Sequence, residues 1–400
     1  MNQYQQYIAL SRYARWIPEL NRRETWKETV DRYMTNVVSD KVSKDTYKQL
    51  EDAIYNLNVM PSMRAMMTAG QAMERDNTCA YNCSYLAVDD PKCFDEAMFI
   101  LLCGTGVGFS VERQYISKLP EVPDELYKSD TTIVVSDSKE GWAKALRQLI
   151  SLLYAGEIPK WDTHKVRPAG AKLKTFGGRA SGAEPLEDLF TFTCETFVAA
   201  KGKKLSSIQS HDLMCKIGEV VVVGGVRRSA MISLSNLSDD RMRHAKSGAW
   251  WENDPQRALA NNSVSYTEKP DAVSFMREWM ALVESGSGER GVFNRQASKK
   301  QAEKNGRRDP NYEFGTNPCS EIILRPNQFC NLTEVVVRAT DSMEDLERKV
   351  KLATILGTIQ STYTKFPYLR KVWNKNTEEE RLLGVSLTGI MDNSLMTIKN

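Results

Sequence analysis

Residues 83–111 have the sequence CSYLAVDDPKCFDEAMFILLCGTGVGFSV, and this stretch decides the fold class. A short apolar and aromatic run at 83–88 is followed by an amphipathic run at 92–103 with the length of a helix, and a second short run follows at 107–111. Short strands that alternate with longer helices are typical of sheets with crossover connections. The stretch therefore predicts an α/β fold.

The same alternation continues toward the C-terminus. We expect further strands at 229–234, 263–266, 291–294 and 331–337, and further helices at 140–153, 185–201, 210–223, 271–285 and 342–365. Residues 1–58 differ, because Trp26, Val30 and Tyr33 recur at helical spacing and an amphipathic stretch follows. We therefore expect a helical N-terminal lobe at 1–58, with the α/β part at 59–400.

Composition narrows the class of protein. The chain has 400 residues, of which 41% are hydrophobic and 26% charged, and its net charge is +3. This is the composition of a globular protein, and it has no basic patch of the kind that binds a nucleic-acid polymer. No run approaches the roughly 20 apolar residues of a membrane-spanning helix, and the first residues lack a secretory apolar core. We expect a cytoplasmic protein with no membrane partner.

The chain contains eight cysteines but only three histidines. Cytosolic thiols are mostly reduced, so a pair that does form a disulfide is expected to be redox-active rather than structural. The spacing of Cys79 and Cys83 is compatible with half of a zinc site, but no second pair completes it. We predict no metal site.

The most unusual segment is TNPCSEIILRPNQFCNL at residues 316–332, in which Asn317, Cys319 and Glu321 occupy alternate positions. In an extended loop, side chains two residues apart project to the same side. A thiol flanked by an amide and a potential general base is a catalytic grouping. The alternative is a cysteine in a surface loop whose neighbours only cap a turn, and the triplet alone leaves both interpretations open.

The segment NPCSEI followed by FCNLTEV resembles the catalytic finger loop of ribonucleotide reductase large subunits. Ordered motifs between residues 60 and 390 resemble the adenosylcobalamin-dependent class, in its monomeric or phage-type branch. These motifs are MPSMRAMMTAG, AYNCSYLAVDDP, LLCGTGVGFSVE, VVSDSKEGW, KVRPAGAKLKTFGGRASGAEPLEDLF, VVVGGVRRSAMISLSNLSDDR, WWENDPQRALANNSVSY and SGERGVFNRQA.

The resemblance implies a ten-stranded α/β barrel of the ribonucleotide reductase and glycyl-radical type at 59–400, with a central finger loop at 316–332. The family continues past LLGVSLTGIMDN to a Pro-Ser/Thr-Gly-Thr-like phosphate loop and a tail with a reducible cysteine pair, and neither follows Gly389 here. We therefore expect a barrel that is incomplete at the C-terminus, in a truncated or split form that needs a complementing polypeptide.

The resemblance also implies a role for each site residue. Cys319 matches the cysteine whose thiyl radical abstracts the ribose C3′ hydrogen, Glu321 the general base on the 3′-hydroxyl, and Asn317 the amide that holds the substrate hydroxyls. Cys83 and Cys330 match the thiols that supply the reducing equivalents and end as a disulfide. The implied product is a 2′-deoxyribonucleotide for DNA synthesis, the branch favours ribonucleoside triphosphates as substrates, and thioredoxin or a similar dithiol would be the reductant.

Nucleotide binding is implied at two places. No GxxxxGK[ST] loop is present, and Ser62 and Gly170 match positions of the family's substrate site. A deoxynucleotide effector would bind through loops resembling 226–230 and 247–257, with Asp90, Arg227 and Arg228 as contacts. The two arginines can equally be solvated surface charges.

Two alternatives to a cobalamin-dependent reductase stay open. The radical could come from a ferritin-like metal subunit, as in class I and minimal phage forms. Alternatively, the chain could be a non-catalytic nucleotide-binding or assembly fragment that keeps the fold without the activity.

Overall fold

The computed structural model describes residues 1–173, 178–223 and 230–397. The chain divides into two compact units. The first unit contains residues 1–82, 173–177 and 329–400, and the second unit contains residues 83–172 and 178–328. The division expected between residues 58 and 59 stays a prediction about domains.

The second unit is built on five parallel strands in the order β10-β9-β8-β5-β4. All five residues of β4 are buried, as expected for parallel strands that are covered on both faces. The five strands expected in this region are therefore confirmed. Their bounds are β4 Cys83–Ala87, β5 Gly106–Ser110, β8 Met231–Asn236, β9 Ala260–Tyr266 and β10 Gly291–Asn294.

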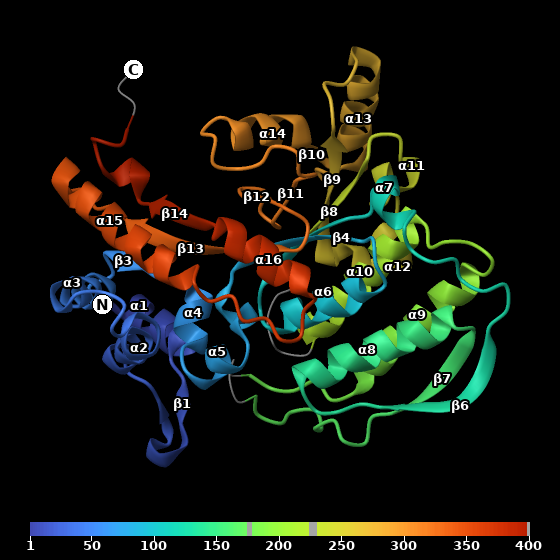
Figure 1. Ribbon diagram of the computed structural model, residues 1–400, viewed down its shortest axis with the longest axis horizontal. Helices are drawn as coiled ribbons and strands as arrows, with labels where there is room; N and C mark the ends of the chain where they lie inside the picture. The colour runs from blue at the N-terminus through green and yellow to red at the C-terminus, as the bar shows by residue number, and fades with distance from the viewer. Residues whose placement is uncertain (174–177, 224–229, 398–400) are drawn as a thin grey trace. The chain divides into compact units, whose positions relative to one another are not determined.

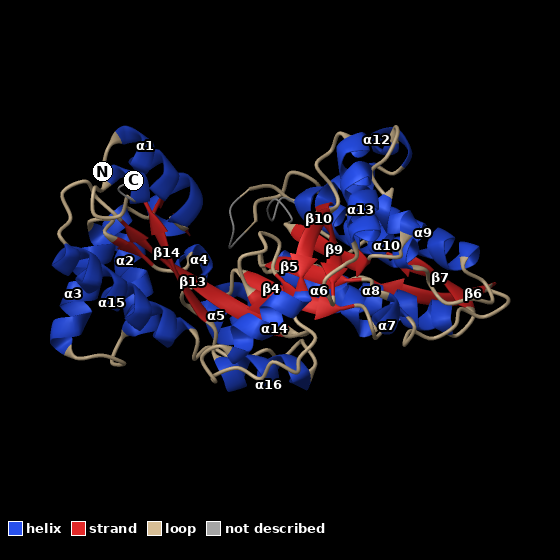
Figure 2. Cartoon of the chain, turned by 90° about the horizontal axis from the view of Figure 1, so that it is seen from above, coloured by secondary structure: helices blue, strands red, loops and turns tan. Residues whose placement is uncertain are grey.

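Helices connect these strands as the sequence predicts (Figure 2). The first crossover helix, α6, is buried from Cys93 to Leu102, which explains why its sequence is apolar almost all round. It packs against α8 and α10. The helices of this unit are α6 Lys92–Leu102, α7 Arg113–Ile116, α8 Lys139–Tyr154, α9 Glu184–Ala199, α10 Ser207–Val223, α11 Asp240–Arg243, α12 Trp250–Asn253, α13 Ala272–Ser285 and α14 Arg295–Glu303.

A second, smaller sheet in this unit was not expected. Strands β6 Tyr127–Val134 and β7 Glu157–Asp162 pair in parallel, and α8 forms the crossover between them (Figure 1). The prediction missed both strands because most residues of β6 are exposed and polar, so they show no run of apolar residues. The helix predicted at 140–153 is confirmed as α8.

The first unit combines N-terminal helices with strands from the end of the chain. Its helices are α1 Gln3–Ile8, α2 Trp26–Tyr33, α3 Lys44–Tyr55, α4 Met63–Thr68, α5 Gln71–Arg75, α15 Met343–Gln360 and α16 Lys371–Glu380. Helix α2 starts at a capping box formed by Thr25 and Glu28, and it buries Val30 and Tyr33 as its helical spacing predicts. The helical character of residues 1–58 is therefore confirmed.

Strand β13 Gln328–Val336 pairs in parallel with β14 Leu383–Thr388 and antiparallel with β3 Val59–Met60. Helix α15 packs on β14 and ends at residue 360, five residues before the predicted end. The short pair β1 Trp16–Ile17 and β2 Arg22–Arg23 completes this unit. Among the described residues, no helix is both long enough and apolar enough to cross a membrane.

Candidate functional site

Residues 315–324 form a hairpin, which we call the finger hairpin. Its strands β11 Gly315–Thr316 and β12 Ile323–Leu324 are antiparallel, and Cys319 lies in the connection between them. The connection is a tight turn, because Ser320 N–H donates to the Asn317 carbonyl at 3.0 Å and Ser320 has a φ of +66°. The extended loop that we expected at residues 317–321 is therefore wrong in its local geometry.

Two glycines let the finger hairpin approach the sheet of the second unit. A Cβ on Gly315 would lie 2.0 Å from the ring of Tyr85 in β4, and a Cβ on Gly108 in β5 would lie 1.7 Å from the Thr316 carbonyl oxygen. No side chain fits at either position, because contacts this short are strongly repulsive. Because both residues lack a side chain, the hairpin can lie directly against β4 and β5.

A buried ion pair anchors the start of the hairpin. Arg295 donates from Nε to the carbonyl of Phe314 at 2.7 Å, and its two terminal nitrogens donate to the carboxylate of Glu112 at 2.8 and 2.6 Å. The side chains of Arg295 and Glu112 are 1% and 0% exposed. Burial alone would lower the pKa of Arg295, but its hydrogen bonds to Glu112 outweigh burial and raise it.

Sequence reasoning missed this ion pair. Glu112 and Arg295 both lie in motifs that carry the family resemblance, and each is a charged residue within two positions of the end of a strand. That position was the available signal for a buried charge. It does not identify the partner, which is 183 residues away along the chain.

Asn317 connects the finger hairpin to the first residue of β4. Its side chain is fully buried, its Nδ2 donates to the Sγ of Cys83 at 3.3 Å, and its Oδ1 accepts from the N–H of Ile322 at 3.0 Å. The structure thus brings together two of the predicted site residues, Asn317 and Cys83.

The two thiols of the second unit's site differ in exposure. Cys83 is buried, whereas Cys319 is exposed, as is Glu321. Burial raises the pKa of Cys83 to about 12; the charge of Glu321 adds to this effect and the Asn317 hydrogen bond opposes it. Burial and the charge of Glu321 also raise the pKa of Cys319. Both thiols therefore hold their protons at neutral pH, which disfavours a thiolate nucleophile.

Cys330 lies in β13 of the first unit and is buried. All eight cysteines are free thiols. Because Cys83 and Cys330 belong to different units, their pairing as a disulfide stays a prediction. Within the described residues, no group of three or more His, Cys, Asp or Glu side chains is placed to hold a metal ion.

The predicted substrate residues lie in different units. The Ser62 hydroxyl caps α4 by accepting from Ala65 N–H at 3.3 Å, and it donates to the Oδ1 of Asn82 at 2.6 Å. Gly170 lies in an exposed loop of the second unit with a φ of +85°, and its N–H donates to the Ala180 carbonyl. The Ser62 hydroxyl is thus engaged within its own unit, and substrate binding by both residues stays a prediction.

The predicted effector residues are described only in part. Arg227 and Arg228 lie outside the described residues. Asp90 follows the carboxyl end of β4, where its Oδ1 accepts from Lys92 N–H at 2.8 Å. In the expected second loop, Arg257 binds the carboxylate of Asp212 at 2.7 and 2.8 Å, so that guanidinium is occupied by the protein itself.

Residues 117–195 match the protein family described as "B12-dependent ribonucleotide reductase, insertion domain". This segment contains β6, α8 and β7, together with most of α9. The unexpected small sheet of the second unit is therefore part of a substructure that this family shares.

Several relatives carry the name "Adenosylcobalamin-dependent ribonucleoside-triphosphate reductase". That of Lactobacillus delbrueckii subsp. bulgaricus is 29% identical over 97% of this chain and 61% of its own length. That of Lacticaseibacillus paracasei is 28% identical over 95% of this chain and 60% of its own length. The chain thus spans about three fifths of the curated relatives it matches.

The crystal structure of a B12-dependent (class II) ribonucleotide reductase has the same fold, with a TM-score of 0.80 and 23% identity. The alignment covers 96% of this chain and 62% of that structure. The predicted α/β fold class is confirmed by this likeness. The chain is thus similar in sequence to adenosylcobalamin-dependent ribonucleoside-triphosphate reductases and shares the fold of a class II ribonucleotide reductase.

Proposed function

We propose that this chain carries the radical cysteine of a ribonucleotide reductase and acts in the reduction of ribonucleotides to 2′-deoxyribonucleotides. The observation that carries the proposal is the finger hairpin, which presents the exposed, protonated thiol of Cys319 and places Asn317 against Cys83. An S–H group that keeps its proton suits hydrogen-atom transfer better than nucleophilic attack. The named activity of the relatives supports the same chemistry.

In the proposed reaction, the thiyl radical of Cys319 takes the C3′ hydrogen of the ribose, and Glu321 accepts the 3′-hydroxyl proton. The 2′-hydroxyl leaves as water. Cys83 and Cys330 together supply two electrons and two protons and form a disulfide: one proton leaves with the 2′-hydroxyl as water and the other ends on C2′. Glu321 then returns its proton to the 3′-oxygen, and the C3′ hydrogen returns from Cys319. Asn317 holds the substrate hydroxyls through its amide, whose position is set by its bonds to Cys83 and Ile322.

Adenosylcobalamin, on which the relatives depend according to their names, would supply the radical that oxidises Cys319. The exposure of Cys319 fits a radical source outside the hairpin, because a buried thiol would be out of its reach. A ferritin-like metal subunit would meet the same exposed thiol, and the experiment below separates the two sources.

The proposed partners follow from this chemistry. A dithiol reductant such as thioredoxin returns the Cys83–Cys330 disulfide to thiols. A complementing polypeptide supplies what the relatives hold in the other two fifths of their length.

The substrate is a ribonucleoside triphosphate, and a deoxynucleotide effector selects the base. Free thiols at all eight cysteines suit the reducing cytoplasm, where we place the reaction.

The test is a turnover assay of the full chain with adenosylcobalamin, dithiothreitol and a ribonucleoside triphosphate, with and without a polypeptide that supplies the remaining family length. We expect deoxynucleotide formation with the added polypeptide, and its complete loss in Cys319→Ser. The control is Cys194→Ser, which alters a buried thiol of α9 outside the site.

Turnover that survives Cys319→Ser would refute the thiyl assignment. Electron paramagnetic resonance of the same mixture reports the radical source: a cob(II)alamin signal supports adenosylcobalamin, and turnover that requires a metal subunit instead contradicts it. Nucleotide binding without turnover in any mixture would favour the non-catalytic fragment.

A further inference from the structure

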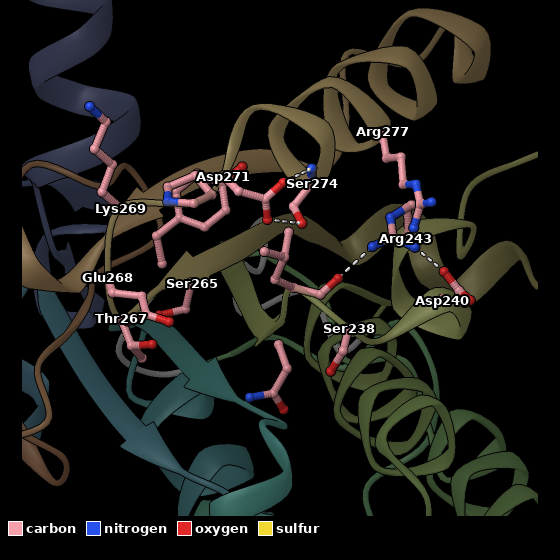
Figure 3. A pocket seen from close by; sticks show the side chains of 14 residues that line it. Ser238, Asp240, Arg243, Ser265, Thr267, Glu268, Lys269, Asp271, Ser274 and Arg277 are labelled. Atoms are coloured by element: carbon pink, nitrogen blue, oxygen red, sulfur yellow. Dashed lines mark hydrogen bonds and ion pairs between the residues drawn. The ribbon is translucent and has the colours of Figure 1, made fainter.

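Helix α13 turns a charged face toward its own unit. The buried carboxylate of Glu278 accepts from Arg290 at 2.5 and 2.8 Å and from Arg243 at 3.0 Å. Asp271 caps the first turn by accepting from the backbone N–H and the hydroxyl of Ser274 at 3.0 and 2.6 Å (Figure 3). These polar contacts hold one side of the helix against the second unit.

The opposite side of α13 is apolar and exposed, at the periphery of the second unit (Figure 1). At about 100° of rotation per residue, six large apolar side chains form one continuous arc of about 160°. Each is between 39% and 62% exposed, and they are Val273, Phe275, Met276, Trp279, Met280 and Val283. A contiguous exposed apolar surface of this kind marks an interaction site.

The spacing within this face is typical of a helix that pairs with another helix. Val273, Met276, Met280 and Val283 follow one another at intervals of three, four and three residues, which are heptad positions a, d, a and d. The order Val-Met-Met-Val reads the same in both directions. In an antiparallel pair of two copies, valine therefore meets valine and methionine meets methionine. A two-fold interface requires such a self-complementary surface.

The charges beside the face favour the same partner. Arg277 and Glu284 are exposed, occupy heptad position e, and have no ion pair within the described ranges. Side chains of a helix lean toward its N-terminus, so in an antiparallel pair Arg277 of each copy leans toward Glu284 of the other. The contact forms twice, once on each side of the two-fold axis. A parallel pair does not bring these two residues together.

We propose that α13 is a dimerisation helix, through which two copies of this chain associate in antiparallel orientation about a two-fold axis. The helix has 14 residues and a length of about 21 Å, so the interface is smaller than that of a standard stable complex. We expect a dissociation constant of about 1–100 μM. The helix contains none of the proposed site residues, and the inference does not depend on the proposed reduction.

Sedimentation velocity of the full chain tests the association at concentrations from about 1 to 500 μM. We expect the mass to rise toward twice that of one chain. The double variant Met276→Glu, Met280→Glu places four carboxylates in the contact and should weaken association about 30-fold or more. The matched control is Met343→Glu in α15, at an equally exposed methionine of the other unit. A chain that stays monomeric throughout, or a dimer that persists in the double variant, would overturn the proposal.

Charge reversal tests the flanking contact. Arg277→Glu puts like charges together twice, so the dissociation constant should rise about fivefold or more. Adding Glu284→Arg to that variant restores opposite charges and should bring the constant back to within about twofold of the original value. A double variant that associates no better than Arg277→Glu alone would refute the antiparallel contact.

Disulfide cross-linking tests the orientation, in a Cys319→Ser background that removes the exposed native thiol. With Val273→Cys and Val283→Cys together, mild oxidation should yield a covalent dimer, whereas Val273→Cys alone should not. The two positions of one helix are about 15 Å apart, too far for an internal disulfide. A covalent dimer from Val273→Cys alone indicates a parallel pair and contradicts the proposal.

Hydrogen–deuterium exchange distinguishes a second copy from the complementing polypeptide as the occupant of this face. We expect protection of α13 to increase with the concentration of the chain alone. Protection that appears only when the complementing polypeptide is added would assign the face to that polypeptide and overturn the proposal. Cys319→Ser should associate as the unaltered chain does, so failure here is distinct from failure of the reductase proposal.

Discussion

The carboxylate of Glu321 acts on both thiols of the candidate site. It raises the pKa of Cys319 in addition to the effect of burial, and it contributes in the same way at Cys83. In the proposed reaction the same carboxylate accepts a proton from the substrate. One residue would therefore serve as the base and also keep the neighbouring thiols protonated.

This dual effect predicts the alkylation behaviour of the folded chain. With iodoacetamide at pH 8, Cys319 is expected to react while Cys83 is protected by burial and by a pKa of about 12. Glu321→Gln lowers the pKa of Cys319, so more thiolate is present at a given pH and alkylation speeds up about two- to fivefold. Mass spectrometry of the labelled peptides measures both rates.

The control for this experiment is Glu344→Gln, which removes an exposed carboxylate in the first turn of α15, in the other unit. We expect no change in the Cys319 rate. A Cys83 that reacts as fast as Cys319 in the folded chain would contradict the site geometry described above.

The buried Glu112–Arg295 pair predicts a large effect on stability. Glu112→Gln leaves the Arg295 guanidinium buried without its counter-charge, which typically costs about 3–5 kcal/mol. Urea unfolding of the full chain measures this loss. The matched control is Lys160→Ala, which removes an ion pair whose partners are 66% and 99% exposed and should change stability little. Equal midpoints for the two variants would show that the buried pair does not anchor the hairpin.

At the scale of elements, the finger hairpin depends on contact between backbones rather than on side-chain packing. Gly108 and Gly315 bring β11 against the strands beneath it, and Arg295 holds the carbonyl of Phe314 just before the hairpin begins. The position of Cys319 is therefore set by the sheet and not by the loop itself.

Gly108→Ala tests this dependence. The added methyl group overlaps the Thr316 carbonyl, so the hairpin must shift, and we expect a loss of stability of about 2 kcal/mol or more together with loss of turnover. The control is Gly291→Ala in β10, where the new methyl group lies 3.1 Å from the Ser263 hydroxyl and 3.9 Å from the Asn262 carbonyl oxygen. Thermal unfolding and the turnover assay give the two readouts. A Gly108→Ala protein that matches Gly291→Ala in both would refute the close approach.

At the scale of the whole molecule, each unit has its own core. In the first unit, the ring of Phe329 lies 4.7 Å from Trp373, 4.9 Å from Phe366 and 5.2 Å from Tyr81, measured between ring centroids. This aromatic cluster joins Tyr81, at the end of the first main segment of the unit, to residues of its second main segment. It stabilises a unit whose two main segments are separated in sequence by the whole second unit.

Trp373→Ala should therefore unfold the first unit selectively. Removing a fully buried tryptophan costs about 3–5 kcal/mol. Hydrogen–deuterium exchange should show lost protection in β13 and α16, with little change in β5 and β8. Trp251→Ala, at a side chain that is 59% exposed, is the control. Loss of protection spread evenly over both units would contradict separate cores.

Local patterns were sufficient for much of the fold. The six strands and six helices expected in the α/β part are present, because apolar periodicity reports directly on which face of an element is buried. Strands β6, β7 and β14 were not predicted. The residues of β6 are mostly exposed, and β14 buries none of its residues completely, so neither strand shows a continuous apolar run.

The candidate site, like the fold, could be predicted from the sequence only in part. The sequence by itself determined the α/β class, the position of most elements and the set of reactive residues around Cys319. Only the tertiary structure decided that Asn317 contacts Cys83, 234 residues away, and that Arg295 pairs with Glu112, 183 residues away. It also decided that the finger turns tightly and that Cys319 is exposed while Cys83 is buried. The physical reason is that side-chain periodicity is a local property, whereas burial and long-range contacts depend on which segments the folded chain brings together.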